Sequence, residues 1–464
     1  MAASALAPQF LEQLARIVGD ADMRTDPADR LPYAYDNSRR QAQPQAVAFA
    51  TAHAEVRDIV RLCNEFLVPL VPRGLGSSTT GSAVPVAGGL VLALERMNRI
   101  INFDPANRAL TCETGVTNST AQEAAGASGF FWPPDPTSAA YSTVGGNLAC
   151  GAGGPHAVKY GTTRDNVLAL RAVTGAGQEL RTGVYTTKGA MGYDFTRLLI
   201  GSEGTLAVVT EATLKLTPKP EAVRTLRAVY ADMEAAAAAV SRIMAQPVTP
   251  CVLEFIDRAS IDMIRGYAET DLPQEAGALL LIEVDGMAAQ LDKAAAAVEA
   301  AARGAGCVEV RAARDAQEAG ALWTSRKALS PALRKIAPKK INEDVVVPVS
   351  RMADFIGRLG ELSKQYGLQI VNFGHAGNGN IHVNLLVDPE NQEQMNHAEP
   401  CLKEIFQTVL SMHGTLSGEH GVGLEKRPFM SLEFDAATLE LMRGVKRLFD
   451  PKGILNPGKL LPEN

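Results

Sequence analysis

Hydrophobic residues in the first half of the chain recur with the spacing of short helices and strands. In residues 54–66, Val56, Ile59, Val60 and Cys63 fall on one side of a helical wheel, which predicts an amphipathic helix. An apolar run at 67–71 predicts a strand directly after it. Further strands are predicted at 90–94, 99–103, 109–113, 168–173, 179–181 and 205–216. Between them, residues 131–161 are rich in Gly, Pro and Ser and are too long to be an inert connector.

The second half of the chain alternates more regularly, and Pro218-Lys219-Pro220 marks the boundary. Helices are predicted at 288–302 and 352–366. Strands are predicted at 224–230, 251–256, 278–284, 307–311 and 344–348. This alternation is typical of an α+β layer in which helices cover one face of a mixed sheet.

Composition describes an ordinary water-soluble protein of more than one domain. The 464 residues exceed what one core supports, and 46% hydrophobic and 21% charged residues are typical of globular chains. A net charge of −6 without a basic run argues against a nucleic-acid partner. Six scattered Cys indicate reduced thiols, and the weakly charged stretch 124–158 contains too many Gly and Pro to cross a membrane. We therefore expect a cytoplasmic protein without a transmembrane segment; a peripheral membrane location and a homodimer stay open.

Two short segments concentrate histidine beside glycine. His375 and His382 flank the turn Gly377-Asn378-Gly379, which can form a hairpin that brings both imidazoles to one face. Farther along, Glu419 and His420 are adjacent. Two His and one Glu form a three-ligand set that leaves coordination positions open, as a catalytic metal requires. His420 would then be available for proton transfer. The alternative is that these histidines are ordinary polar residues, the interpretation we give to His53, His397 and His413.

Glycine-rich loops suggest a phosphate-containing ligand. Residues 73–78, Arg-Gly-Leu-Gly-Ser-Ser, follow a predicted strand, and residues 145–154 form a second loop. Neither a Rossmann GxGxxG opening a helix nor a Walker GxxxxGK[ST] is present. Either loop alone could be a plain turn. Two non-helical glycine loops in one domain favour a diphosphate ligand that lies along the backbone rather than on a helix N-terminus.

Several motifs resemble known flavoproteins. Pro72 to Ser78, Val144 to Gly154, Tyr160-Gly161 and Ile200 to Leu206 are similar to the FAD-binding domain of the vanillyl-alcohol oxidase (PCMH-type) family. Residues 374–384, 417–423 and 455–459 resemble its 2-hydroxy-acid branch, which contains D-lactate dehydrogenases, D-2-hydroxyglutarate dehydrogenases and the flavin subunit of glycolate oxidase.

The resemblance covers nearly the whole chain and implies an α+β architecture. It implies a PCMH-type FAD-binding domain with two subdomains, an α+β (ferredoxin-like) substrate or cap domain, and a C-terminal segment that returns to the FAD domain. The corresponding boundaries are an N-terminal helical segment at 1–40, the FAD domain at 41–219, the cap at 220–415 and the C-terminal segment at 416–464.

The resemblance also implies a set of FAD contacts. The residues carried over are Arg73, Gly74, Leu75, Gly76, Ser77, Ser78 and Gly81 at the diphosphate; Pro136, Thr137, Ser138, Gly145, Gly146 and Asn147 at the flavin and ribityl chain; Gly161 and Asn166 nearby; Glu203, Gly204 and Val209 at the adenine half; and Asn456 over the flavin. Because the first loop has neither His nor Cys, the expected FAD is non-covalent; His156 is the one candidate for a covalent link.

On the substrate side, the resemblance makes Arg326 the cation for a substrate carboxylate, which a guanidinium can bind through two hydrogen bonds. From the residues alone, the favoured interpretation of Arg326 is an arginine on the surface of a helix. Asn384 shares a strand face with His382 by period-two alternation and is a candidate hydrogen-bond donor. Ser330 stands where hydroxyglutarate enzymes tend to have Thr, and Lys340 is offset from their lysine, so Lys339 and Lys340 could also be solvated.

The resulting hypothesis is FAD-dependent oxidation of a D-2-hydroxy acid, D-lactate-like, to the 2-oxo acid. The metal, Zn²⁺ or Mn²⁺ at His375, His382 and Glu419, would hold the hydroxyl and carboxylate; His420 would remove the proton while hydride passes to flavin N5. D-2-hydroxyglutarate dehydrogenase, and the flavin subunit of a multi-subunit glycolate oxidase, are alternatives. A metal-dependent hydrolase is a third hypothesis, and a non-enzymatic binding module a fourth. The electron acceptor, whether quinone, cytochrome or an electron-transferring flavoprotein, stays open.

Overall fold

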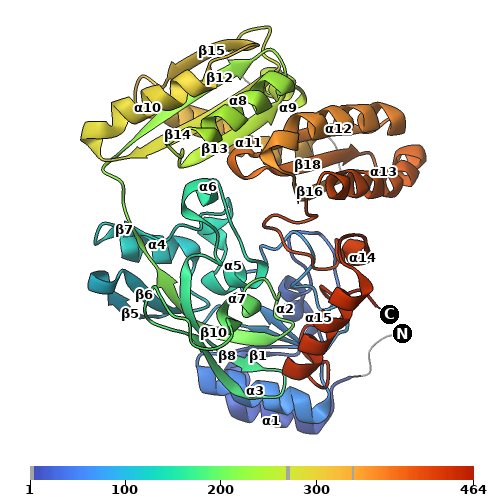
Figure 1. Cartoon of the computed structure of the whole chain (residues 1–464). Helices are drawn as coiled ribbons and strands as arrows, with labels where there is room; N and C mark the ends of the chain where they lie inside the picture. Colours follow the sequence, from blue (N-terminus) through green and yellow to red (C-terminus); the bar gives the residue numbers. More distant parts are fainter. Residues whose placement is uncertain (1–4, 268–271, 337–338, 464) are drawn as a thin grey trace. The chain divides into compact units, whose positions relative to one another are not determined.

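The computed structural model describes residues 5–267, 272–336 and 339–463, and the chain divides into two compact units (Figure 1). Unit 1 consists of Met1–Gly153, Gly161–Lys219 and Glu419–Asn464. Unit 2 consists of Gly154–Tyr160 and Pro220–Gly418. Its main segment lies close to the sequence boundaries at 220 and 415, and the short insertion Gly154–Tyr160 has no counterpart in those boundaries.

Unit 1 contains two larger sheets. The four-stranded sheet has the order β1-β2-β4-β3 and the five-stranded sheet the order β5-β6-β10-β8-β9. The strands are β1 Met23–Arg24, β2 Ala46–Phe49, β3 Leu70–Arg73, β4 Leu90–Ala93, β5 Ile100–Asp104, β6 Ala109–Glu113, β7 Phe130–Phe131, β8 Val167–Thr174, β9 Glu179–Gly183, β10 Ala207–Lys215 and β11 Thr217–Pro218. The helices are α1 Pro8–Val18, α2 Pro27–Arg30, α3 His53–Phe66, α4 Asn118–Gly126, α5 Val144–Cys150, α7 Phe195–Leu199, α14 Met430–Glu433 and α15 Ala436–Phe449.

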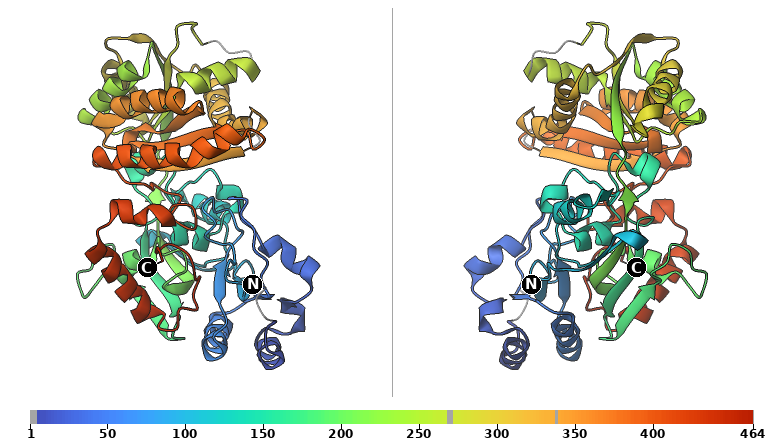
Figure 2. Two further views of the ribbon diagram at one scale, coloured as in Figure 1. Left: turned by 90° about the vertical axis from the view of Figure 1, so that its right-hand side faces the viewer. Right: turned by 90° about the vertical axis from the view of Figure 1, so that its left-hand side faces the viewer.

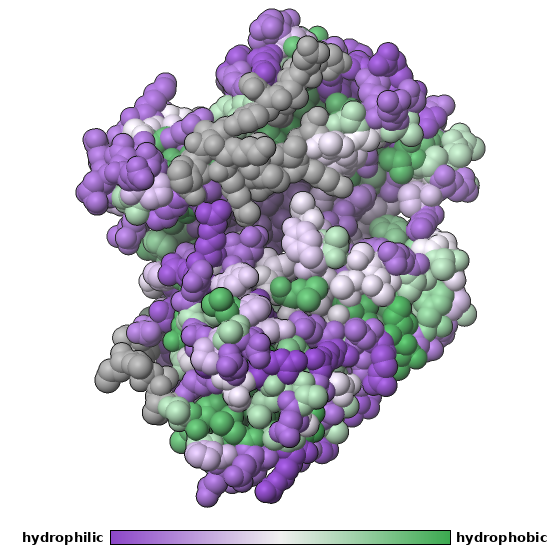
Figure 3. All heavy atoms as spheres, turned by 180° about the vertical axis from the view of Figure 1, so that it is seen from behind, coloured by the Kyte–Doolittle hydropathy of each residue, from purple (hydrophilic) through white to green (hydrophobic). Residues whose placement is uncertain are grey.

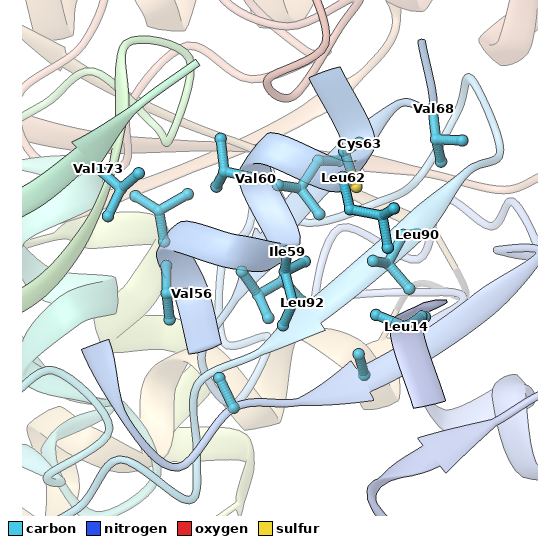
Figure 4. Close-up of a cluster of buried hydrophobic side chains, with 14 of the residues drawn as sticks. Leu14, Val56, Ile59, Val60, Leu62, Cys63, Val68, Leu90, Leu92 and Val173 are labelled. Atoms are coloured by element: carbon cyan, nitrogen blue, oxygen red, sulfur yellow. The ribbon is translucent and has the colours of Figure 1, made fainter. Parts of the chain in front are cut away.

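The predicted amphipathic helix is α3, and its apolar side forms part of the core of unit 1. Val56, Ile59 and Val60 are fully buried in one cluster with Leu90 and Leu92 of β4 (Figure 4). Burying a side chain of this size contributes roughly 1.5–3 kcal/mol. The N-terminal helix α1 adds two buried side chains to the same cluster, so the helical segment before residue 40 is part of unit 1.

The C-terminal segment returns to β3, as the sequence predicted. Leu70 N donates to Ile454 O at 2.8 Å, and Asn456 N donates to Leu70 O at 2.7 Å. This pairing places residues 454–456 beside the strand that leads into the first glycine loop. A segment far away in the sequence therefore completes unit 1.

Unit 2 is built on a seven-stranded sheet with the order β15-β12-β14-β13-β17-β18-β16. Its strands are β12 Ala222–Tyr230, β13 Val252–Asp257, β14 Ala278–Gly286, β15 Cys307–Ala312, β16 Lys339–Val346, β17 Gln369–His375 and β18 Asn380–Val387. Every pairing among these described strands is antiparallel, so the expectation of a mixed sheet is wrong. Antiparallel strands can be joined by a tight turn, as β17 and β18 are, whereas parallel strands need a longer crossover connection. The alternation of helices and strands along the sequence does not distinguish these two kinds of connection.

Helices pack on both faces of this sheet (Figures 1 and 2). The helices of unit 2 are α6 Ala157–Tyr160, α8 Met233–Ala245, α9 Arg258–Tyr267, α10 Ala288–Ala302, α11 Ala316–Ile336, α12 Met352–Tyr366 and α13 Gln392–Ser411. Helices α8, α10, α12 and α13 contact one another and the sheet in a continuous layer. Helices α9 and α11 form the other layer, where Ile261 and Leu329 pack with Ile256 and Phe373 of the sheet. The prediction that helices cover only one face of this sheet is therefore wrong.

The prediction of a non-helical loop at residues 145–154 is also wrong for the first part of that segment. Residues Val144–Cys150 form the helix α5, whose N-cap Thr143 accepts a hydrogen bond from Gly146 N, so this segment is not a non-helical loop. Glycine lowers helix propensity, which is why the sequence alone favoured a loop, but the cap offsets part of that cost. Similarly, β16 begins at Lys339, five residues before the predicted strand at 344.

The face of the molecule in Figure 3 is largely hydrophilic, with separate hydrophobic patches. Among the described residues, no helix is long and apolar enough to cross a bilayer.

Candidate active site

One face of the unit 2 sheet carries a row of polar residues across four neighbouring strands. Directly opposite residues of an antiparallel pair project to the same side. Glu254 of β13 is opposite His375 of β17. In β18, His382 is opposite Asp344 of β16, and Asn384 is opposite Asn342. Because positions two apart share a face, these side chains form one polar stripe, which we call the polar row.

The two histidines of the predicted hairpin meet on this face. The ring centroids of His375 and His382 are 5.1 Å apart, with the rings at 85° to each other. The hairpin turn depends on Gly379, which has a φ of +69° and whose Cβ, if present, would lie 1.9 Å from Val347 O. Only glycine combines this positive φ with the absence of a Cβ, so Gly379 allows the tight turn that brings the two imidazoles close together.

Glu254 joins His375 to Arg326. Its Oε2 accepts hydrogen bonds from Arg326 Nη2 at 2.7 Å and Nε at 3.0 Å, while its Oε1 is hydrogen bonded to His375 Nδ1. The carboxylate is 1% exposed, so it is desolvated and must be paired. Burial alone would raise the pKa of Glu254, but the adjacent His375 and Arg326 outweigh burial and hold that pKa below its usual value.

Arg326 is therefore not a helix-surface arginine. It lies on α11, is 9% exposed, and its guanidinium also stacks over the Phe373 ring at 4.6 Å from the centroid. Nε and Nη2 each direct one N–H at Glu254, and the guanidinium's other three N–H donors are the two of Nη1 and the second of Nη2.

The other predicted substrate residues are placed as follows. Asn384 is fully buried; its Nδ2 donates to Val371 O and His382 O, and its Oδ1 accepts from Asn342 Nδ2 at 2.7 Å. Its amide thus holds the sheet together. Lys340 is opposite Leu386 and so projects to the same side as the polar row. Ser330 falls on α11, but its side chain lies outside the described residues.

Glu419 follows immediately after the last residue of unit 2. That residue, Gly418, donates its N–H to Asp344 at 2.9 Å, and Thr415 pairs with Val346 in a β-bridge. Asp344 is itself opposite His382. The peptide bond between Gly418 and Glu419 is thus held at the strand next to the histidines. His420 and the residues after it belong to unit 1.

A second group of potential ligands occurs in unit 2. One donor atom each of His156, Cys251 and Glu283 lies within 4.8 Å of the others. Glu283 Oε1 already accepts from Thr225 and Trp323, and Cys251 Sγ donates to Glu283 O at 3.3 Å. These bonds connect Glu283 with Thr225, Trp323 and Cys251.

In unit 1, three predicted FAD segments converge. A Cβ on Gly74 would lie 2.4 Å from Thr143 Oγ1, so the first glycine loop packs against the start of α5. At the other end of α5, Glu203 N donates to Ala149 O at 2.9 Å. The fold therefore gathers residues around 74, 143–150 and 201–204 in one place.

Two buried donors in these segments fit an acidic or carbonyl-rich ligand. Arg73 Nη1 and Asn147 Nδ2 are buried and have no hydrogen-bond partner among the residues that the structure describes. Buried donors are rarely left unsatisfied, so an acceptor is expected there. Burial lowers the pKa of the Arg73 guanidinium, partly offset by the Asp36 carboxylate, and an anionic ligand would relieve that burial cost. A diphosphate and a flavin carbonyl would supply such acceptors, so these residues fit FAD.

Glu203 and Asn456 have protein partners. Glu203 Oε2 accepts from Gly423 N at 2.8 Å and Oε1 accepts from Val422 N, while Asn456 Nδ2 donates to Ser82 O and Glu203 O. Their side chains thus hold the loop after His420 and the C-terminal segment. Burial raises the pKa of Glu203 to about 7, against the opposing effect of these N–H groups.

The remaining predicted FAD residues all lie in unit 1. Leu75, Gly76, Ser77, Ser78 and Gly81 lie in the loop after β3; Pro136, Thr137 and Ser138 precede a 3-10 turn at Ala139–Tyr141; Gly145 and Gly146 open α5; Gly161 and Asn166 precede β8; Gly204 precedes β10 and Val209 lies in it. Their contacts with FAD stay a prediction.

Comparison with known proteins identifies the family. Residues 44–183 match the model described as "FAD binding domain", and residues 219–460 match "FAD linked oxidases, C-terminal domain". The chain is 39% identical to glycolate oxidase subunit GlcD of Bacillus subtilis over 98% of this chain and 97% of that protein. It is 33% identical to a D-lactate dehydrogenase of Anaerostipes hadrus (90% of each chain) and 34% identical to a D-2-hydroxyglutarate dehydrogenase of Xanthomonas citri (98% and 97%).

Solved structures agree on the fold. The structure of p-cresol methylhydroxylase with substrate bound superposes with a TM-score of 0.81 at 18% identity, covering 97% of this chain and 96% of the other. The fold is therefore the PCMH-type FAD-binding fold, as predicted. The chain belongs to the FAD-linked oxidases and is an FAD-linked oxidoreductase.

Sequence reasoning missed Glu254 and Asp344. Glu254 is a carboxylate inside the otherwise apolar run Val252 to Ile256, and Asp344 directly precedes the apolar run Val345 to Val347. Charged residues are almost never buried unless paired, so an acidic residue inside a buried strand was a usable signal.

Proposed function

We propose that this protein oxidises a D-2-hydroxy acid to the corresponding 2-oxo acid, with non-covalent FAD and a divalent metal. The observation that carries the proposal is the polar row of unit 2, where two imidazoles and a buried Glu–Arg pair share one sheet face in a chain of the FAD-linked oxidases. The names of the relatives, which include glycolate, D-lactate and D-2-hydroxyglutarate enzymes, support a hydroxy-acid substrate.

His375, His382 and Glu419 would hold the metal. Support comes from the 5.1 Å separation of the imidazole rings and from the anchoring of Gly418 beside His382 through Asp344. Nitrogen and carboxylate donors suit Zn²⁺ and also Mn²⁺. When bound, the metal supplies Lewis-acid polarisation of the substrate hydroxyl, and the flavin supplies the acceptor for hydride at N5.

His420 would remove the hydroxyl proton. Its segment is held in unit 1 by the two N–H bonds to Glu203, and Leu424 N donates to Thr80 O at 2.8 Å. A base on a fixed backbone needs little reorganisation to reach the proton. General-base assistance of this kind contributes roughly 10²–10⁴-fold to the rate.

Arg326 would bind the substrate carboxylate. Glu254 orients the guanidinium from one side, so the remaining donors can be directed at a second carboxylate. Asn384 would contribute indirectly, because its amide bonds fix the backbone at His382.

Two substrates fit this arrangement. A D-lactate-like acid needs one cation, which Arg326 provides. D-2-hydroxyglutarate needs a second, and the projection of Lys340 to the side of the polar row favours this alternative. Ser330, whose side chain lies outside the described residues, stays a predicted substrate residue.

The test is anaerobic bleaching of the flavin by a panel of D- and L-2-hydroxy acids, with and without a chelator. We expect D-acids to bleach the flavin and chelator to abolish the reaction. No bleaching by any D-acid would refute the substrate class, and bleaching that chelator leaves unchanged would refute the metal. Comparing D-lactate with D-2-hydroxyglutarate in wild type and Lys340→Ala separates the two substrates, because only the dicarboxylate should lose affinity.

A further inference from the structure

The buried carboxylate of Glu254 touches both halves of the proposed substrate site. One oxygen is hydrogen bonded to His375 Nδ1, and the other accepts two hydrogen bonds from Arg326. A carboxylate with two oxygens, each committed to a different partner, sets the relative positions of those partners. The 1% exposure of Glu254 excludes solvent as a competing partner.

We propose that Glu254 is a positioning residue that aims His375 at the metal and Arg326 at the substrate carboxylate. The inference rests on the metal assignment proposed above. Because the carboxylate accepts a hydrogen bond, the proton of neutral His375 is held at Nδ1, which makes Nε2 the ring nitrogen that can bind a metal. A carboxylate behind a metal-binding histidine typically improves metal affinity by 10–100-fold, as roughly measured in other sites.

The backbone makes this arrangement rigid. Glu254 and His375 are register partners in adjacent strands, β13 and β17, and both strands are central in the sheet. Arg326 enters from α11, and its guanidinium is also fixed by stacking on Phe373. Neither the histidine nor the arginine can therefore rotate independently of Glu254.

The experiment measures metal affinity of the metal-stripped, FAD-loaded protein by competition with a Zn²⁺ indicator dye. Glu254→Gln should weaken Zn²⁺ binding about 10–100-fold while FAD content is unchanged. Asp257→Asn is the matched control, because Asp257 is a buried carboxylate on the same strand that accepts from Ser260 N and Asn372 N instead. Its Zn²⁺ affinity should equal that of wild type. A Glu254→Gln affinity within about twofold of wild type would overturn the inference.

Two further readouts separate positioning from a general structural role. In Glu254→Gln, excess Zn²⁺ should restore kcat, whereas the KM for the hydroxy acid should stay raised because Arg326 is no longer oriented. In metal-free wild type labelled with ¹⁵N-histidine, His375 should be protonated at Nδ1. A wild-type His375 protonated only at Nε2 would overturn the inference even if the variant failed to fold. A wild type that binds no Zn²⁺ would instead refute the metal proposal, leaving the Nδ1 result as an independent test.

Discussion

The two units use different parts of the polypeptide for their chemistry. In unit 1, the predicted cofactor segments are rich in glycine and approach one another closely, and Arg73 and Asn147 provide two buried donors for a ligand. In unit 2, the polar row consists of side chains on paired strands. A large ligand with many acceptors can be bound by backbone N–H groups, whereas a small substrate and an ion need charged side chains at defined positions. We therefore expect substitutions in unit 1 to change FAD binding, and substitutions in the polar row to change turnover while FAD content stays the same.

The largest effect is expected at the histidine pair. His382→Ala should lower turnover by about 10³-fold or more, because several kcal/mol of Lewis-acid stabilisation is lost, and should leave FAD content unchanged. Turnover and the flavin spectrum are measured together. His397→Ala is the control, since His397 Nδ1 is hydrogen bonded to Tyr366 O away from the polar row. Loss of FAD from the His382→Ala variant would contradict the expectation that the polar row of unit 2 acts independently of FAD binding in unit 1.

His420→Ala should slow flavin reduction by about 100-fold, the lower end of general-base contributions, since water can partly replace the imidazole. Zn²⁺ affinity should remain that of wild type. Stopped-flow reduction under anaerobic conditions measures the rate. Full turnover in this variant would remove the role of His420 as the base.

In unit 1, Gly74→Ala should weaken FAD binding about 10-fold, because the new Cβ would lie 2.4 Å from Thr143 Oγ1 and overpacking of this kind costs roughly 1–3 kcal/mol. Zn²⁺ affinity should not change. Flavin fluorescence during dilution measures the release of FAD. The control is Gly320→Ala in α11, where the Cβ meets nothing within 4 Å. Equal FAD affinity in both variants would contradict the packing of the first loop on α5.

The smallest effect concerns pH. Because burial raises the folded-state pKa of Glu203 to about 7, the folded protein binds an additional proton between pH 4.5 and 7. Stability should therefore fall as pH rises through this window. Glu203→Gln should flatten the fall, measured as the free energy of unfolding in denaturant. Burial lowers the pKa of Lys459 to about 8, so its opposite contribution, a rise in stability with pH, lies above this window. An unchanged slope in the variant would show that Glu203 titrates normally.

Local patterns predicted the elements well. The helix at 288–302, the helix at 352–366 and the strand at 109–113 have the predicted bounds, because each is a self-contained periodic run. The hairpin between His375 and His382 followed from turn chemistry that only glycine allows. By contrast, α5 was expected to be a loop, because its cap and its packing against Gly74 and Ala149 are not visible in the glycine-rich sequence.

The sequence by itself determined the family, the FAD-binding fold and the pairing of His375 with His382, since these rest on motifs, local periodicity and one glycine turn. Only the tertiary structure decided that Glu254 joins His375 to Arg326. Three segments separated by about seventy and fifty residues contribute to that contact, and the strand register that brings them together depends on packing of the whole sheet. No local pattern records which strands become neighbours, so the partner of a buried carboxylate could not be predicted from the sequence.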